Sequence, residues 1–140
     1  MVDLDKESTT SGPRFRQTIS MALCFRDSRI NISKKTMEAL GMPGYVHLLI
    51  DRGQKWLFLK ACERDKDAIN VYYTTGEGSE LFHYQIIGKT LLSLISGIMG
   101  VGRYSDSLRL LGSYLPDDEA VYFDMNRYDV IPYGEENSNL

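Results

Sequence analysis

Very few residues in this 140-residue chain have the types and spacing that catalysis needs. Gly88-Lys89-Thr90 matches the end of a phosphate-binding loop. That loop requires G-x-x-x-x-G-K-[ST], however, and His83 holds the position of its first glycine. Gly97, Gly100 and Gly102 have the reverse spacing of a dinucleotide fingerprint and favour the end of a helix instead. No Ser/His/Asp or Cys/His set can be assembled, so we expect a protein that is not an enzyme.

Metal binding is not expected either, because the candidate ligands are few. The two cysteines and two histidines all stand among apolar, strand-like residues, at Cys24, Cys62, His47 and His83. They cannot supply four convergent ligands without help from a carboxylate. We therefore expect two reduced core thiols, no metal ion and no cofactor. The acidic residues 117–119 are interpreted as a solvated turn.

The charge distribution suggests an anionic partner for the first half of the chain. The net charge is −3, but residues 1–65 carry 11 Lys or Arg against 8 Asp or Glu, whereas residues 66–140 carry 5 against 11. A basic segment beside an acidic one suggests that the basic segment alone meets nucleic acid. Ordinary solvated surface is the alternative explanation.

The composition, 43% hydrophobic and 25% charged, is that of a soluble globular protein. No signal peptide is recognisable, since residues 21–25 are too short for its apolar region. The apolar residues 86–101 fall short of a membrane span. We expect a cytoplasmic protein that does not enter the membrane.

Residues 29–62 contain the pattern of a strand, a helix and a hairpin. The strand pattern leads to Ser33, which suits a helix N-cap, and Gly41 suits the position after that helix. Two apolar runs, 45–50 and 56–61, flank a polar loop and predict a hairpin. With these residues, this order resembles the SpoVT/AbrB-like swapped-hairpin family of small bacterial transcription factors and antitoxins over residues 17–62.

The resemblance implies a DNA-binding fold in which arginines of the first strand and its following loop meet DNA. Ser33 departs from it, since the family commonly has proline there. Arginine can read guanine edges, while lysine contacts the phosphate backbone. By position, the implied DNA-binding residues are Arg14, Arg16, Arg26, Arg29, Lys34 and Lys35.

The second half repeats the order of helix and hairpin. Apolar residues recur at helical spacing over 86–99, and strand-like runs follow at 107–115 and 120–125. We expect an α+β fold of antiparallel strands with two main helices. Its second unit is either a degenerate copy, which makes the chain a pseudo-dimer, or a separate appended domain. The expected division is a disordered arm (1–13), an AbrB-like unit (14–65), a second unit packed on it (66–133) and a disordered tail (134–140).

Periodicity also predicts the core. The residues expected to be buried are Ile30, Ile32, Met37, Leu40, Val46, Leu48, Ile50, Trp56, Phe58 and Leu94.

Two functions remain open at this point. The first is a DNA-binding transcriptional regulator of a bacterium, phage or mobile element, acting on duplex DNA as a homodimer or a pseudo-dimeric monomer. The second is an antitoxin-like or phage-encoded inhibitor that binds a protein through its acidic half, where eight of the nine tyrosines lie.

Overall fold

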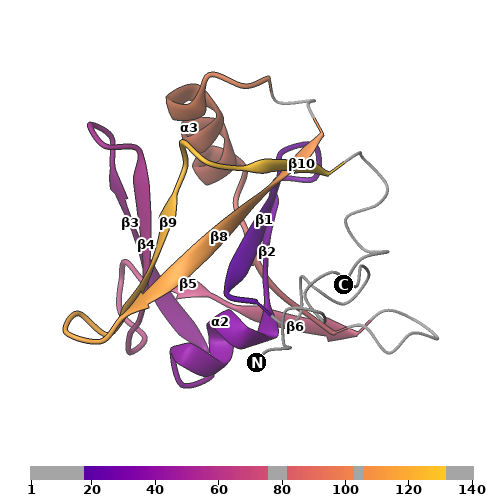
Figure 1. The fold of residues 1–140 in the computed structure, drawn as a ribbon. Coiled ribbons are helices and arrows are strands. Elements are labelled where there is room, and N and C mark those ends of the chain that lie inside the picture. Colours follow the sequence, from indigo (N-terminus) through magenta and orange to yellow (C-terminus); the bar gives the residue numbers. More distant parts are fainter. Residues whose placement is uncertain (1–17, 76–81, 103–105, 132–140) are drawn as a thin grey trace, which may run out of the picture.

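The computed structural model describes residues 18–75, 82–102 and 106–131. Strands dominate these residues, and the two helices are short (Figure 1). The helices are α2 (Lys34–Ala39) and α3 (Lys89–Met99). The strands are β1 (Ser20–Cys24), β2 (Arg29–Ile32), β3 (Tyr45–Asp51), β4 (Trp56–Ala61), β5 (Ile69–Asn70), β6 (Tyr72–Thr75), β7 (Phe82–Ile87), β8 (Ser107–Leu115), β9 (Ala120–Asp124) and β10 (Asp129–Ile131).

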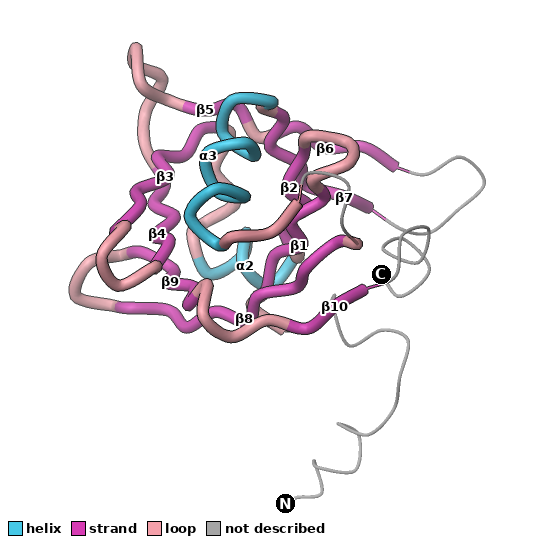
Figure 2. Tube along the Cα trace, turned by 90° about the horizontal axis from the view of Figure 1, so that it is seen from above, coloured by secondary structure: helices cyan, strands magenta, loops and turns pink. Residues whose placement is uncertain are grey.

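The strands form one antiparallel sheet that nearly closes on itself. Their order is β5-β3-β4-β9-β8-β1-β2-β7-β6, and β10 pairs with β8 outside this path. β5 and β6 stand at opposite ends of the order, yet Val71 alone separates them in the chain, so the sheet curves into a barrel. Figure 2 shows the strands as a ring around the helices, and Figure 1 places α3 at the upper end of this ring and α2 at the lower end.

The expected α+β fold is therefore wrong. The two helices have 6 and 11 residues and cover the ends of a barrel-like sheet, so they do not form a layer against separate hairpins. Residues 86 and 87, assigned to the helix by their apolar spacing, belong to β7, and Gly88 is the N-cap of α3. A short apolar run at a strand–helix junction fits either periodicity, which explains the misplaced boundary.

The two halves of the chain share this sheet strand by strand. The first half supplies the hairpins β1–β2 and β3–β4, and the second supplies β6–β7 and β8–β9. Between the halves, β2 pairs with β7, β4 pairs with β9, and β1 pairs with β8. The expected units 14–65 and 66–133 thus alternate within a single sheet.

The interior of the barrel is apolar, with contributions from both halves. Ile30, Ile32, Met37 and Val46 are buried, as predicted. Leu40, Leu48 and Ile50 are partly buried and pack against this core. Other fully buried side chains are Met21, Leu23, Ile86, Ile95, Leu110 and Phe123.

The predicted phase of β4 is wrong, because Leu57 and Leu59 face the core while Trp56 and Phe58 are half-buried. Leu94 is half-buried as well, and α3 buries Leu92 and Ile95 instead. Both faces of β4 carry large apolar residues, so alternation alone cannot say which face turns inward.

Of the four glycines predicted to end helices, two have the left-handed backbone that this role requires, whereas the prediction for Gly97 is wrong because this residue lies inside α3. Gly41 has φ of 86° after α2, and Gly100 has φ of 74° at the C-cap of α3. Within the described part of the chain, no helix is long and apolar enough to cross a membrane.

Gly112 lies where β8 passes from one partner to another. β8 pairs with β1 through residues 108–111 and with β9 through residues 112–115. The Gly112 N–H donates to the Ile19 carbonyl at 2.8 Å. A Cβ on Gly112 would lie 2.6 Å from Cε1 of Phe123, whose ring is fully buried. This close approach of β8 to the core side of β9 requires glycine.

We predict that Gly112→Ala lowers the free energy of unfolding by about 1–3 kcal/mol, the usual effect of overpacking. Gly97→Ala is the control, since a Cβ there meets nothing within 4 Å and the residue lies in α3. It is expected to raise stability by roughly 0.5–1 kcal/mol. Urea unfolding of both variants gives the measurement, and an unchanged Gly112→Ala protein would show that β8 and β9 do not pack this closely.

Candidate functional site

The predicted DNA-binding residues do not form one basic stripe in the part of the chain that the structure describes. Arg14 and Arg16 lie outside the described residues. Arg26 is exposed in the β1–β2 turn. Arg29 begins β2, with its side chain 24% exposed and its Nη1 3.4 Å from Oδ2 of Asp27. An arginine held by a neighbouring carboxylate has less charge to offer a phosphate.

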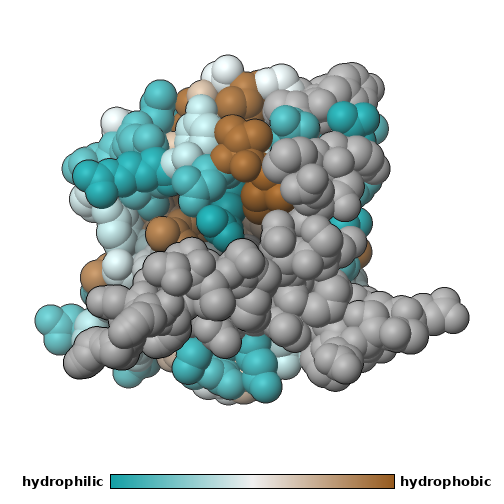
Figure 3. All heavy atoms as spheres, turned by 45° about the vertical axis from the view of Figure 1, so that its right-hand side comes forward, coloured by the Kyte–Doolittle hydropathy of each residue, from teal (hydrophilic) through white to brown (hydrophobic). Residues whose placement is uncertain are grey.

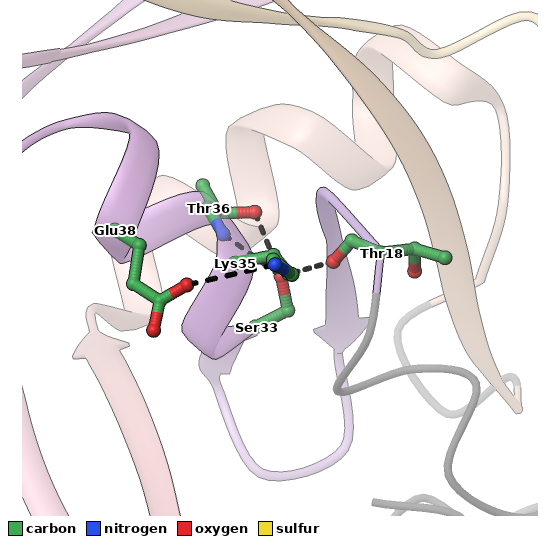
Figure 4. Close-up of polar contacts among 5 residues, drawn as sticks. All are labelled: Thr18, Ser33, Lys35, Thr36 and Glu38. Atoms are coloured by element: carbon green, nitrogen blue, oxygen red, sulfur yellow. Dashed lines mark hydrogen bonds and ion pairs between the residues drawn. The ribbon is translucent and has the colours of Figure 1, made fainter.

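Lys34 and Lys35 lie at the other end of β2, in the first turn of α2. Four residues of strand separate them from the β1–β2 turn, a distance of roughly 13 Å. Both are exposed, and Nζ of Lys35 lies 3.9 Å from Oε1 of Glu38 (Figure 4). The basic residues therefore fall into two separate groups.

A buried polar cluster fixes the start of α2 to the start of β1. The Oγ of Ser33 accepts the Thr36 N–H at 3.2 Å and donates to the Thr18 carbonyl at 2.6 Å (Figure 4). Thr36 Oγ1 accepts the Ser20 N–H at 2.9 Å and donates to the Ser20 carbonyl at 3.0 Å. The predicted N-cap is thus confirmed. These hydroxyl groups form hydrogen bonds to buried backbone groups of the protein itself, so their role is structural.

The outer surface of β3, β4, β8 and β9 carries a group of apolar and aromatic side chains, here called the aromatic face. It consists of Leu49, Trp56, Phe58, Leu111 and Tyr122. Phe58 pairs with Leu49 on one side and with Tyr122 on the other, which makes a continuous cross-strand row. Leu49 is 50% exposed and Leu111 is 58% exposed.

The three rings of the aromatic face are in mutual contact. The centroid of Trp56 lies 4.9 Å from that of Tyr122 and 6.1 Å from that of Phe58, both with an edge-on angle of 72°. Phe58 and Tyr122 are 5.9 Å apart with their planes tilted by 34°. Such packing fixes the ring orientations at the surface before any partner arrives.

An open groove of about 720 Å³ continues the aromatic face beyond β9. Leu111 and Tyr122 belong to both, and the connection from β9 to β10 supplies Arg127 and Tyr128. Nη2 of Arg109 donates to Oδ2 of Asp129 at 3.1 Å in its wall. The volume is in the range of pockets that bind ligands, and the lining mixes rings with charges of both signs.

Apolar side chains also reach the surface elsewhere. Figure 3 shows a strip of them among hydrophilic residues on the face seen there. Ile87 and Val130 are 58% and 57% exposed. Apolar atoms make up much of the surface of folded proteins, so exposure by itself does not mark a site. The aromatic face differs because its three rings are in mutual contact and Leu49 pairs with Phe58.

One group with metal-ligand chemistry occurs among the described residues. His47, Cys62 and Asp65 place one ligand atom each within 4.8 Å of the others. Burial, followed by the charges of Asp65 and Glu63, raises the pKa of the Cys62 thiol. The hydrogen bond with His47 is the main cause that lowers the pKa of the Asp65 carboxyl.

The expected environment of the sulfur atoms is correct for one cysteine and wrong for the other. Both are free thiols, and Cys24 is buried, but Cys62 is half-buried beside Asp65. His83 has its side chain outside the described part of the structure. Asp117, Asp118 and Glu119 are exposed in the β8–β9 turn, in agreement with the interpretation from sequence.

Sequence reasoning missed the aromatic face and Asp65 for identifiable reasons. Alternation assigns Trp56 and Phe58 to the core, but it fits Leu57 and Leu59 equally well. Asp65 stands in the charged run 63–67, and nothing local in the sequence indicates that this run folds back beside β3. The doubly apolar β4 is a signal that could have raised the possibility of an exposed apolar surface.

No family model, curated protein or solved structure matches this chain. The functional argument therefore depends on the geometry of the described residues.

We predict that Thr36→Val destabilises the protein by about 1–3 kcal/mol, since it removes two buried hydrogen bonds to the Ser20 backbone, whose N–H and carbonyl each keep one bond to Ser33. Lys35→Ala is the control and should change stability by no more than about 0.5 kcal/mol, because its ion pair is exposed. Chemical denaturation measures both. Equal effects of the two substitutions would contradict the structural role assigned to the hydroxyl cluster.

Proposed function

We propose that this chain is a protein-binding module, without enzymatic activity, that docks a partner protein on its aromatic face. The observation that carries this proposal is the continuous row of Leu49, Phe58 and Tyr122 across β3, β4 and β9. Contiguous exposed apolar surface costs solubility, and proteins retain it mainly where a partner covers it. Tryptophan and tyrosine are also the residues most often found at the energetic centre of protein interfaces.

The groove beside the aromatic face adds polar recognition to apolar contact. The Arg109–Asp129 ion pair, together with Arg127 and Asp124, places charges of both signs in this groove. Interfaces commonly combine an apolar centre with a polar rim of this kind. The partner expected here presents apolar side chains to the aromatic face and a segment with charges of both signs to the groove.

This proposal changes the expected location of the protein-binding surface. The sequence argument placed it in the acidic half of the chain, but the aromatic face draws Leu49, Trp56 and Phe58 from the basic half. The barrel brings them beside Tyr122 and Leu111 through the pairing of β4 with β9. Both halves would therefore contribute to one interface.

Duplex DNA is the second candidate partner, favoured by the exposed Arg26, Lys34 and Lys35 and by the resemblance of residues 17–62 to swapped-hairpin regulators. It ranks below a protein partner because carboxylates lie beside some of the described basic residues. Arg29 lies beside Asp27, and Lys35 lies beside Glu38. Their separation into two groups also weakens the continuous positive surface that DNA binding needs.

The test of the protein-binding proposal uses the intact chain as bait in an extract of its source organism, followed by calorimetric titration of the purified partner. Leu111→Ser should weaken binding about tenfold or more, because interface centres commonly lose over 1 kcal/mol on truncation. Ile87→Ser is the matched control, since Ile87 is equally exposed at 58% but lies on β7, away from the face. Equal affinity of the two variants would refute the assigned surface.

The same preparation tests DNA binding by titration of random duplex at increasing salt. Each phosphate contact contributes about 0.9 to the slope of log K against log salt. If DNA is the partner, replacing both Arg26 and Arg29 by alanine should flatten the slope by about 1–2 units while the fold persists. The regulator would replace the protein-binding proposal under two conditions. The arginine substitutions must flatten the salt slope of DNA binding, and Leu111→Ser must leave DNA binding unchanged. Absence of binding at about 50 mM salt would exclude the regulator.

A further inference from the structure

The base of the β3–β4 hairpin brings together three side chains that have no part in the aromatic face. His47 lies in β3, Cys62 directly follows β4, and Asp65 lies in the loop that leads to β5. Their ligand atoms are all within 4.8 Å of one another. Nε2 of His47 is 3.2 Å from Oδ2 and 3.3 Å from Oδ1 of Asp65.

Backbone hydrogen bonds hold each of the three residues in place. The β3–β4 pairing runs through Val46 and Ala61, and the Cys62 N–H extends it by donating to the Tyr45 carbonyl at 3.0 Å. Cys62 is therefore fixed one residue beyond the end of the ladder, across from the strand that carries His47. A site built on regular strands keeps its donor atoms in a defined geometry.

Asp65 is held by hydrogen bonds within the turn formed by residues 65–68. Its Oδ1 accepts the Asp67 N–H at 2.9 Å, and its carbonyl accepts the Ala68 N–H at 3.2 Å. β5 then pairs with the start of β3, which closes the loop against the same strand. The carboxylate consequently approaches His47 as a result of the fold.

The three donor types match the preferences of zinc. Cysteine sulfur, histidine nitrogen and aspartate oxygen all bind Zn²⁺ at about 2.0–2.3 Å. A tetrahedral ion with such bonds holds its ligand atoms roughly 3.3–3.7 Å apart. Nε2 of His47 lies 3.3 Å from Oδ1 of Asp65, which agrees with this spacing, and the sulfur of the half-buried Cys62 lies within 4.8 Å of a ligand atom of each of the other two residues. A thiolate and a carboxylate together neutralise the charge of a dication.

We infer that His47, Cys62 and Asp65 form a binding site for a transition-metal dication, with zinc as the preferred ion. Three protein ligands leave the fourth tetrahedral position to water or to a group from another molecule. Sites that are purely structural usually close with four protein ligands. The half-buried position of His47 and Cys62, and the exposure of Asp65, keep the fourth position accessible.

This inference revises the expectation from sequence that no metal ion is bound. That expectation counted two cysteines and two histidines and required a carboxylate to complete a set. The fold supplies the carboxylate as Asp65 and selects one cysteine and one histidine. It leaves Cys24 apart, where the Asn31 amide donates to its sulfur at 3.7 Å.

The experiment titrates the chelator-treated, reduced full chain with zinc by calorimetry and with cobalt by optical spectroscopy. We expect one equivalent of either metal and a thiolate-to-cobalt charge-transfer band. Cys62→Ser should abolish that band and weaken zinc binding by more than about 100-fold, since loss of even an outer partner of a ligand costs about 10–100-fold. Asp65→Asn and His47→Gln should each weaken it strongly.

Asp67→Asn is the matched control, because Asp67 lies in the same loop but outside the ligand group, and it should bind zinc as the unaltered protein does. A second measurement needs no substitution, since zinc should protect Cys62 of the unaltered chain from alkylation by iodoacetamide. The inference is overturned if zinc fails to bind at about 1 mM, if Cys62→Ser retains the affinity, or if zinc leaves the alkylation of Cys62 unchanged.

Discussion

Pairing between the two halves of the chain is the constraint on which the rest of the structure depends. β2 meets β7, β4 meets β9 and β1 meets β8, so the backbone donors and acceptors of each half are satisfied by the other. β5 and β6 stand at opposite ends of the strand order, and Val71 alone joins them in the chain. This short connection holds the two ends of the sheet together and nearly closes it. Gly112 permits the tightest approach in this arrangement, where β8 turns from β1 to β9 over the ring of Phe123.

Closure of the sheet also determines what the surface can do. A barrel has room inside for one face of each strand, so the second apolar face of β4 must point outward. Leu57 and Leu59 fill the interior, and Trp56 and Phe58 meet Tyr122 of β9 outside it. The pairing of β5 with β3, at one end of the strand order, folds the β4–β5 loop back to β3 and places Asp65 beside His47. The aromatic face and the His–Cys–Asp group are thus two consequences of one topology.

Local features of this fold could be predicted from the sequence, and long-range ones could not. Ser33 as an N-cap, Gly41 and Gly100 as helix ends, and the hairpin around residues 51–55 follow from the chemistry of neighbouring residues. The pairing of β4 with β9 joins residues 60 or more positions apart, from Lys60 with Ala120 to Trp56 with Asp124, and alternation says nothing about such partners. The phase of β4 depends on that pairing, and the approach of Asp65 to His47 depends on the pairing of β5 with β3, so alternation misplaced the first and local sequence could not show the second.

The central claim is that the two halves form one cooperative barrel, and native-state hydrogen exchange in increasing urea tests it most directly. Amides of β2 and β4 in the first half, and of β7 and β9 in the second, should exchange through a single global opening with one free energy and one urea dependence. Protection in β2 and β4 that persists at urea concentrations where β7 and β9 exchange freely would contradict the account, because it would show two independently stable units.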